Sequence, residues 1–229
     1  MAAVRRYGGK YVSLNLHQDA SLEESSLLQR LREGDQQALA DLFARERGRL
    51  ERIVRFRLDP RLFGRVDVDD VLQETYLETL QRLPHYFRDP QVSFFVWLRS
   101  VTRQTLIDIH RRHLRAQARD VDREVSVESW RFPLATSASL ASFLAADITS
   151  PSQAAMRDER AQQLQRALEE LDEIDREVLA LRHFEDLSNQ EVAETLGISQ
   201  KAASMRYVRA LERLKEMLGK DQGRRTTDQ

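Results

Sequence analysis

Two runs of charged residues of opposite sign are the features of this 229-residue chain most suited to binding chemistry. Between Asp67 and Leu80 there are no basic residues and five acidic ones: Asp67, Asp69, Asp70, Glu74 and Glu78. From Arg99 to Arg119 there are six arginines and a single acid, Asp108. Carboxylates pair with cationic surfaces, and guanidinium groups pair with phosphates or carboxylates. This sorting indicates separate faces for separate partners, with a solvated helix face as the alternative for either run.

A third pattern lies near the C-terminus and predicts two helices joined by a tight turn. Ser188 and Glu191 have the spacing of a capping box. Gly197 suits the turn because glycine adopts left-handed dihedrals at little cost, and Ser199 can cap the next helix. Ala193, four residues before Gly197, allows the helices to cross closely. Helix, glycine turn and helix are typical of a helix-turn-helix.

The predicted last helix, which ends near Leu218, has two distinct faces at 100° per residue. Within about 40° of Tyr207 lie the expected core residues Ala203, Leu211, Leu214 and Leu218. The opposite, cationic face collects Lys201, Ala202, Met205, Arg206, Arg209 and Arg213. Arginine can bond guanine edges or hold phosphates, so this face predicts DNA reading in a major groove. A helical hairpin with a solvated basic face is the alternative.

The elements around these residues are predicted to be helical. The chain has only 8 glycines and 5 prolines, and apolar residues recur at helical spacing without strand-like alternation. Asp67 is a good N-cap for a helix that we expect to end at Pro84. A loop over 84–90 then precedes a long helix over 92–115, with Trp97 on its apolar side. The predicted fold class is all-α, with two small helical domains joined by a long linker.

The domain boundaries follow from changes in composition. An N-terminal tail over 1–21 precedes a first domain over 22–116. Ser21 and Glu24 can cap the first helix of this domain. A linker over 117–151 ends at Ser150-Pro151-Ser152, and its three large aromatic residues are expected to dock on a surface: Trp130, Phe132 and Phe143. A second domain over 152–218 and a tail over 219–229 complete the chain.

Composition excludes several classes of protein. The chain has no cysteine, so thiolate chemistry and disulfides are excluded. No run approaches the ~18 apolar residues of a membrane span, and we expect a cytoplasmic protein. The chain has no phosphate-binding loop, dinucleotide fingerprint or nucleophile motif, which argues against an enzyme. We expect no cofactor and no metal site, and we expect His110 and His113, on a basic helix, to contact phosphate or solvent.

Three segments of the first domain carry a resemblance to a known family. They are Asp67-Val68-Asp69-Asp70-Val71-Leu72-Gln73-Glu74-Thr75-Tyr76, then Phe94-Phe95-Val96-Trp97-Leu98-Arg99, then Leu106-Ile107-Asp108-Ile109-His110-Arg111-Arg112. They resemble region 2 of the extracytoplasmic-function (ECF) sigma factors of bacterial RNA polymerase, and residues 187–218 resemble region 4. The segment Thr149-Ser150-Pro151-Ser152 and residues 199–214 resemble the branch abundant in planctomycetes. The resemblance covers about 22–116 and 152–218.

The resemblance implies three binding surfaces and no catalysis. One would grip core RNA polymerase through Asp70, Gln73 and Glu74. A second would capture and melt the minus-ten promoter element through Phe87, Arg88, Asp89, Arg99, Arg103, Gln104, Arg111, Arg112 and Arg115. The third would read the minus-thirty-five element through Ser199, Lys201, Ala202, Met205, Arg206, Arg209 and Arg213. Gln104 stands where many members have Asn, and Ala202-Ala203 where many have Thr-Val, so the promoter sequence is not predicted.

Promoter DNA and core polymerase are therefore the expected partners, and an anti-sigma factor or a regulatory kinase is a further candidate. Two other kinds of protein fit the same helices. A two-domain transcription regulator would bind duplex DNA alone and ignore core polymerase. A scaffold for sigma-like partners would use its basic helices on acidic protein surfaces and bind DNA with little sequence preference.

Overall fold

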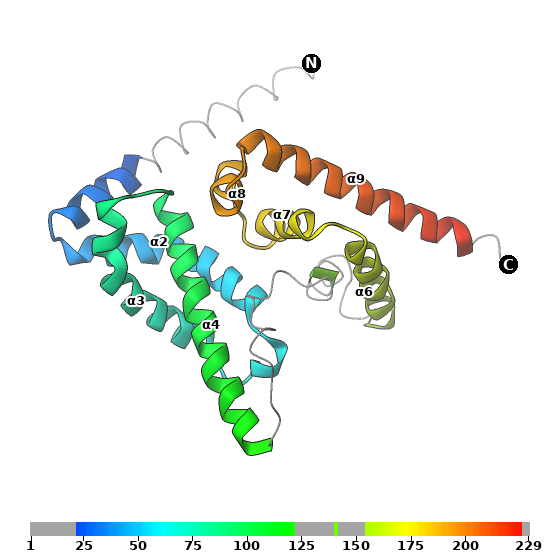
Figure 1. Ribbon diagram of the computed structural model, residues 1–229, viewed down its shortest axis with the longest axis horizontal. Helices are drawn as coiled ribbons and strands as arrows, with labels where there is room; N and C mark the ends of the chain where they lie inside the picture. The colour runs from blue at the N-terminus through cyan, green and yellow to red at the C-terminus, as the bar shows by residue number, and fades with distance from the viewer. Residues whose placement is uncertain (1–21, 122–139, 142–153, 226–229) are drawn as a thin grey trace, which may run out of the picture. The chain divides into compact units, whose positions relative to one another are not determined.

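The computed structural model describes residues 22–121, 140–141 and 154–225 (Figure 1), and these residues divide into two units that meet in sequence between Gly48 and Arg49. The segments in the two units are helical, and the described residues contain no strand. The predicted all-α class is confirmed. None of the helices in the described part of the chain is long and apolar enough to cross a membrane.

The first unit contains a helix over 22–32 and the beginning of α2 (Gln36–Arg57). The turn between them contains Gly34 at φ 95, and the Asp35 carboxylate accepts a 3.0 Å hydrogen bond from the Gln37 backbone N–H. Leu39 and Leu42 of α2 are buried at a helical spacing. The predicted capping residue Ser21 lies outside the described residues.

The second unit begins with the end of α2, the short 3-10 helix η1 (Pro60–Leu62), and the long helices α3 (Val68–Arg88) and α4 (Phe94–Val121). Helices α3 and α4 pack side by side (Figure 1). Val71 and Leu72 on α3 are buried, as are Leu98, Val101 and Leu106 on α4. These front helices, meaning α2 from Arg49 together with α3 and α4, hold the acidic run and the arginine run.

Helix α3 begins as predicted but ends later. The Asp67 side chain caps it by accepting a 2.9 Å hydrogen bond from the Asp69 N–H. The predicted end at Pro84 is wrong, because the helix continues to Arg88. Proline lacks the N–H that would bond the preceding turn. The turn after it buries Tyr86, whose ring centroid lies 4.7 Å from that of Trp97, and this packing offsets the missing hydrogen bond.

The rear helices are α6 (Ala154–Glu169), α7 (Glu173–His183), α8 (Asn189–Leu196) and α9 (Gln200–Arg225). They share a core to which Leu168, Leu179 and Leu214 contribute. Leu140 and Ala141, from the predicted linker, are also buried in this core. The linker aromatic residues Trp130, Phe132 and Phe143 lie outside the described residues.

Candidate nucleic-acid interface

The turn between α8 and α9 has the geometry that the sequence predicts. The Ser188 hydroxyl accepts from the Glu191 N–H at 3.2 Å, and the Glu191 carboxylate accepts from the Ser188 N–H at 2.7 Å. Gly197 has φ 65, in the left-handed region, and the Ser199 hydroxyl accepts from the Ala202 N–H at 3.1 Å. Both helix starts are therefore fixed by side chains, and the predicted helix-turn-helix is present.

One side of α9 packs against the other rear helices, although its centre is shifted from the predicted one. Ala203, Ala210 and Leu214 are buried and Tyr207 is half-buried. The prediction that Leu211 is a core residue is wrong, because its side chain is 38% exposed. Small Ala210 faces the neighbouring helices instead, which allows a close approach and turns Leu211 toward solvent.

The predicted reading face of α9 is largely open to solvent. Ser199, at the N-terminus of the helix, is exposed, and Ala202 is half-buried. Lys201, Met205, Arg209 and Arg213 are exposed. Arg206 differs, since its guanidinium donates a 2.7 Å hydrogen bond to the largely buried carboxylate of Asp175 on α7. The face thus presents one lysine and two arginines to a ligand, with Arg206 tied to the protein in this structure.

Val208 is a surface residue that the sequence did not assign to the reading face. Its side chain is 51% exposed and lines a shallow hollow with Ser204, Met205 and Arg209. On a helical wheel Val208 lies between the predicted core face and the predicted cationic face, and a valine side chain did not indicate to which of the two faces it belongs. An apolar patch beside an arginine suits a base edge that carries a methyl group, as thymine does.

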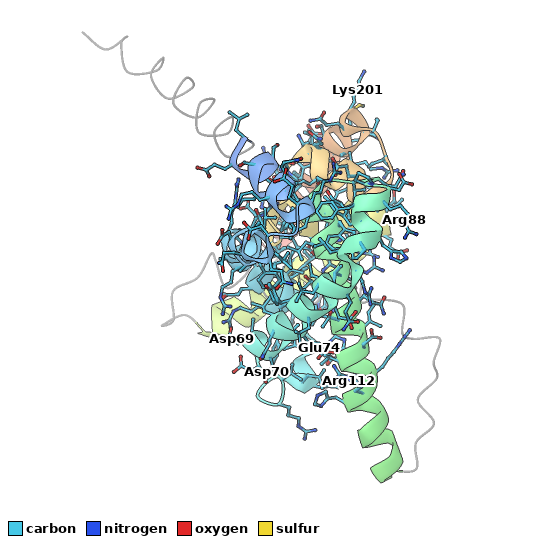
Figure 2. The ribbon with its side chains drawn as sticks, turned by 90° about the vertical axis from the view of Figure 1, so that its left-hand side faces the viewer. Asp69, Asp70, Glu74, Arg88, Arg112 and Lys201 are labelled. Carbon is cyan, nitrogen blue, oxygen red and sulfur yellow. The ribbon has the colours of Figure 1, made fainter. Side chains whose placement is uncertain are left out.

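The acidic surface lies on the first half of α3 (Figure 2). Of the predicted polymerase-contacting residues, Asp70 and Gln73 are exposed and Glu74 is half-buried. Arg112 of α4 donates to both carboxylate oxygens of Glu74 at 2.6 Å, and Figure 2 shows the two side chains next to each other. An arginine predicted to bind DNA therefore neutralises one of the carboxylates predicted to bind polymerase.

The predicted aromatic and polar pocket residues lie at the C-terminal end of α3. Phe87 is half-buried against Tyr86, with the ring centroids 5.6 Å apart. Arg88 and Asp89 are exposed, and Asp89 caps the helix. These three residues are thus presented by a helix end and not by the predicted loop.

The predicted phosphate-tracking residues of α4 have different surroundings. Arg99 is only 4% exposed and ion-pairs with Glu185, whereas Arg103 is exposed. The Gln104 amide donates to the Asp108 carboxylate at 3.2 Å, and Arg111 lies 3.8 Å from the same carboxylate. Arg115 lies on α4, in a part of the helix for which the structure describes the backbone alone.

The prediction that His110 contacts phosphate or solvent is wrong. It is 5% exposed, and its Nε2 accepts a 3.3 Å hydrogen bond from the backbone N–H of Asp59. Burial lowers the pKa of His110 below its ordinary value, which favours this neutral, accepting form. Among the described residues, no three His, Asp or Glu side chains gather as a metal would require.

Comparisons with known proteins agree with this arrangement. Residues 42–119 match the family model for sigma-70 region 2, and residues 161–214 match that for sigma-70 region 4. The chain is 31% identical over 198 residues to the RNA polymerase sigma factor CarQ of Myxococcus xanthus, covering 84% of this chain and 95% of that protein. It is 30% identical over 183 residues to the ECF RNA polymerase sigma factor SigD of Mycobacterium tuberculosis, covering 80% and 78%.

A solved structure of CnrH in complex with the cytosolic domain of CnrY is also similar, with 26% identity, a TM-score of 0.48, and coverage of 87% of this chain and 99% of that chain. On its two matched regions and its relatives, the chain belongs to the sigma-70 family, as an ECF-type sigma factor. It is accordingly a factor for promoter-specific transcription initiation by RNA polymerase.

Proposed function

We propose that this sigma factor divides promoter recognition between its front and rear helices. The rear helices read the minus-thirty-five element in the duplex, and the front helices melt the minus-ten element while they dock on core polymerase. The observation that carries the proposal is the exposed cationic face of α9, which follows a capped α8 and a left-handed glycine turn. That arrangement is how a helix-turn-helix presents a reading helix to a major groove.

Within the reading face, the side chains can be assigned roles by their chemistry. Arg209 is exposed beside Met205 and Val208, so it can bond a guanine edge while the two apolar side chains contact thymine methyl groups. Lys201 and Arg213 lie nearer the two ends of the exposed face and suit phosphate contacts. The small side chains of Ser199 and Ala202 allow the start of α9 to lie close to the DNA backbone.

The minus-ten surface is proposed at the end of α3 and along α4. Phe87 offers an aromatic ring for a flipped base, while Arg88 and Asp89 offer polar groups on the same helix end. Arg103, Arg111 and Arg112, with Arg115 further along α4, would track the single strand. Gln104 is held by Asp108, which orients its amide. Arg99 can join this set only after it leaves its buried ion pair.

The polymerase-docking surface is proposed on the first half of α3. Asp70 and Gln73 are exposed there, next to Leu77, which is 52% exposed. Carboxylates beside an exposed apolar side chain suit a basic protein surface with an apolar centre. Glu74 would take part by exchanging Arg112 for a cation of the polymerase.

Further aspects of this proposal rest on sequence. Action on RNA polymerase implies a cytoplasmic location, and the planctomycete-like branch rests on the residues near 149–152 and 199–214. An anti-sigma factor or regulatory kinase is a proposed partner, because the polymerase-docking surface is exposed and open to competition. As a sigma factor, the chain would supply recognition while the polymerase supplies catalysis.

The test of the reading assignment is a promoter-library selection with polymerase carrying either the unmodified protein or Arg209→Ala. We expect Arg209→Ala to relax the preference at one or two positions of the upstream element, at a cost of about 1–3 kcal/mol, with the downstream preference unchanged. Glu170→Ala, at an exposed turn after α6, is the control. An unchanged upstream preference for Arg209→Ala would remove Arg209 from the proposed reading set.

A further inference from the structure

The buried carboxylate of Asp175 lies under one edge of the reading helix α9. Its side chain is only 9% exposed, and its Oδ1 accepts a 2.7 Å hydrogen bond from Nη1 of Arg206. Asp175 stands in the first turn of α7, where the partial positive charge of a helix N-terminus favours an anion. Arg206 is therefore held by a carboxylate that has two sources of positive potential beside it, the start of α7 and the guanidinium itself.

Arg206 uses only one of its guanidinium nitrogens in this contact. Its side chain is 34% exposed, and neither Nε nor Nη2 has a hydrogen-bond partner among the residues that the structure describes. A guanidinium can serve two anions at once, because its N–H groups form a rigid planar fork. The head group is thus fixed on its protein side and still has donors for a ligand on its solvent side.

The position of Arg206 on α9 indicates which part of DNA it would meet. At about 100° per residue, the midpoint between Met205 and Arg209 lies about 180° from Tyr207, and Arg206 lies about 80° from that midpoint. The major groove is about 12 Å wide, hardly wider than a helix with its side chains, so the edges of an inserted helix face the sugar–phosphate walls. Arg206 is therefore placed for a phosphate and not for a base edge.

A guanidinium that is already fixed binds a phosphate more tightly than a free one. A long side chain loses rotamer freedom when a ligand immobilises it, and this loss weakens binding. The hydrogen bond to Asp175 restricts Arg206 before DNA arrives. The next residue, Tyr207, is joined through its hydroxyl to Nε2 of His183 at the end of α7, 3.0 Å away, so α7 fixes two successive residues of α9.

We propose that Asp175 is a positioning residue for promoter binding, which orients Arg206 so that the free side of its guanidinium contacts a DNA phosphate beside the minus-thirty-five element. The inference rests on the proposed function and deepens it, since it gives Arg206 a role distinct from the base contact proposed for Arg209. Asp175 itself does not touch DNA and acts through Arg206. If Asp175 merely withheld Arg206 from DNA, loss of its charge would strengthen binding, whereas a positioning role predicts weaker binding.

The direct test neutralises single phosphates of the DNA. Full-length protein and core polymerase form a holoenzyme, which binds promoter fragments that each carry one uncharged methylphosphonate in the upstream element. With the unmodified protein we expect a position at which this change weakens binding on the order of tenfold, because a charge-assisted hydrogen bond is lost. With Arg206→Ala the same change should alter binding by less than about twofold, and the slope of log Kobs against log salt concentration should fall by about 1.

Asp175→Asn keeps the shape of the side chain and removes its charge. In a variant that retains its helical circular dichroism, we expect binding weakened by about threefold to tenfold, a smaller penalty at the same phosphate and an unchanged base preference. Asp172→Asn is the matched control, because Asp172 is exposed at the start of the same helix and its side chain makes no capping hydrogen bond. The control should not weaken binding. Unchanged or tighter binding by Asp175→Asn would overturn the positioning role.

A second variant tests the same contact in case Asp175→Asn does not fold. Arg206→Lys keeps the charge, but a lysine has no planar fork with which to bridge Asp175 and a phosphate. It should retain the salt dependence and bind several-fold more weakly than the unmodified protein, and equal binding would overturn the proposal.

Failure of the inference and failure of the proposed function give different results. Upstream methylphosphonate penalties that are identical in the unmodified protein and in Arg206→Ala would overturn the inference alone. If no upstream methylphosphonate weakens binding of the unmodified holoenzyme, the rear helices do not bind upstream DNA, and the proposed function fails together with the inference.

Discussion

Arg206 and Arg209 are neighbours on α9, but among the residues that the structure describes only Arg206 has a partner, the Asp175 carboxylate at 2.7 Å. Asp175 is only 6% exposed, so the Arg206 guanidinium replaces much of the water that would otherwise solvate its carboxylate. We predict that Arg206→Ala lowers the free energy of unfolding by about 1 kcal/mol, because it leaves a buried carboxylate without its cation. Urea unfolding of the purified protein measures this loss. Arg209→Ala should change stability by less than about 0.5 kcal/mol, and an equal loss in both variants would contradict the assigned roles.

His110 makes a second prediction at the scale of one residue. Burial lowers its pKa from the ordinary 6.5, with Asp59 opposing and Arg61 and His113 assisting, so the folded state resists a proton that the unfolded state accepts. The free energy of unfolding should therefore be highest above pH 6.5 and fall as the pH drops below it. The decline from pH 7.5 to 5.5 should be smaller in His110→Gln than in the unmodified protein.

His113→Gln is the matched control, since His113 is exposed on the same helix. It should retain nearly all of the decline, because His113 makes the smallest of the contributions that lower the pKa of His110. His183 adds a contribution of the same sign, because partial burial also lowers its pKa. A decline that is unaffected by His110→Gln would show that the buried imidazole does not couple folding to pH.

At the scale of elements, the capped helix starts and the glycine turn that ends α8 were predictable, whereas the end of α3 was not. Asp67, Ser188 and Ser199 cap helices as predicted, because a cap depends on side chains within three residues of it. The continuation of α3 past Pro84 was not predictable, because it depends on the packing of Tyr86 against Trp97, which lies eleven residues after Tyr86. Leu211 was misassigned because its burial depends on which side of α9 meets the neighbouring helices.

A substitution in the α8–α9 turn can separate the effect of backbone conformation on stability from the effect of packing. A Cβ at Gly197 would meet nothing within 4 Å, but its φ of 65 is left-handed. Gly197→Ala should therefore lower the free energy of unfolding by about 1 kcal/mol through backbone strain alone. Gly48→Ala, inside α2 with equal space, should instead stabilise by up to about 1 kcal/mol. Thermal unfolding of the two variants measures both changes in stability. If both substitutions destabilised the protein, the cause would be the space that the added Cβ fills and not backbone strain at Gly197.

At the scale of the whole molecule, the charges that the sequence shows as separate runs are partly paired across the fold. Arg99 binds Glu185, and Arg112 binds Glu74. Neither pair could be predicted, because each joins residues far apart in the chain whose meeting depends on tertiary packing. The candidate site could be predicted as a set of faces, while the state of each arginine, exposed or bound, could not.

Run-off transcription is the most direct test of whether this chain confers promoter specificity on RNA polymerase. Purified core polymerase would be assayed on genomic promoter fragments with and without the protein. We predict new start sites that require the protein and share one upstream and one downstream element. No new start sites, together with failure of the protein to co-elute with core polymerase, would contradict the account.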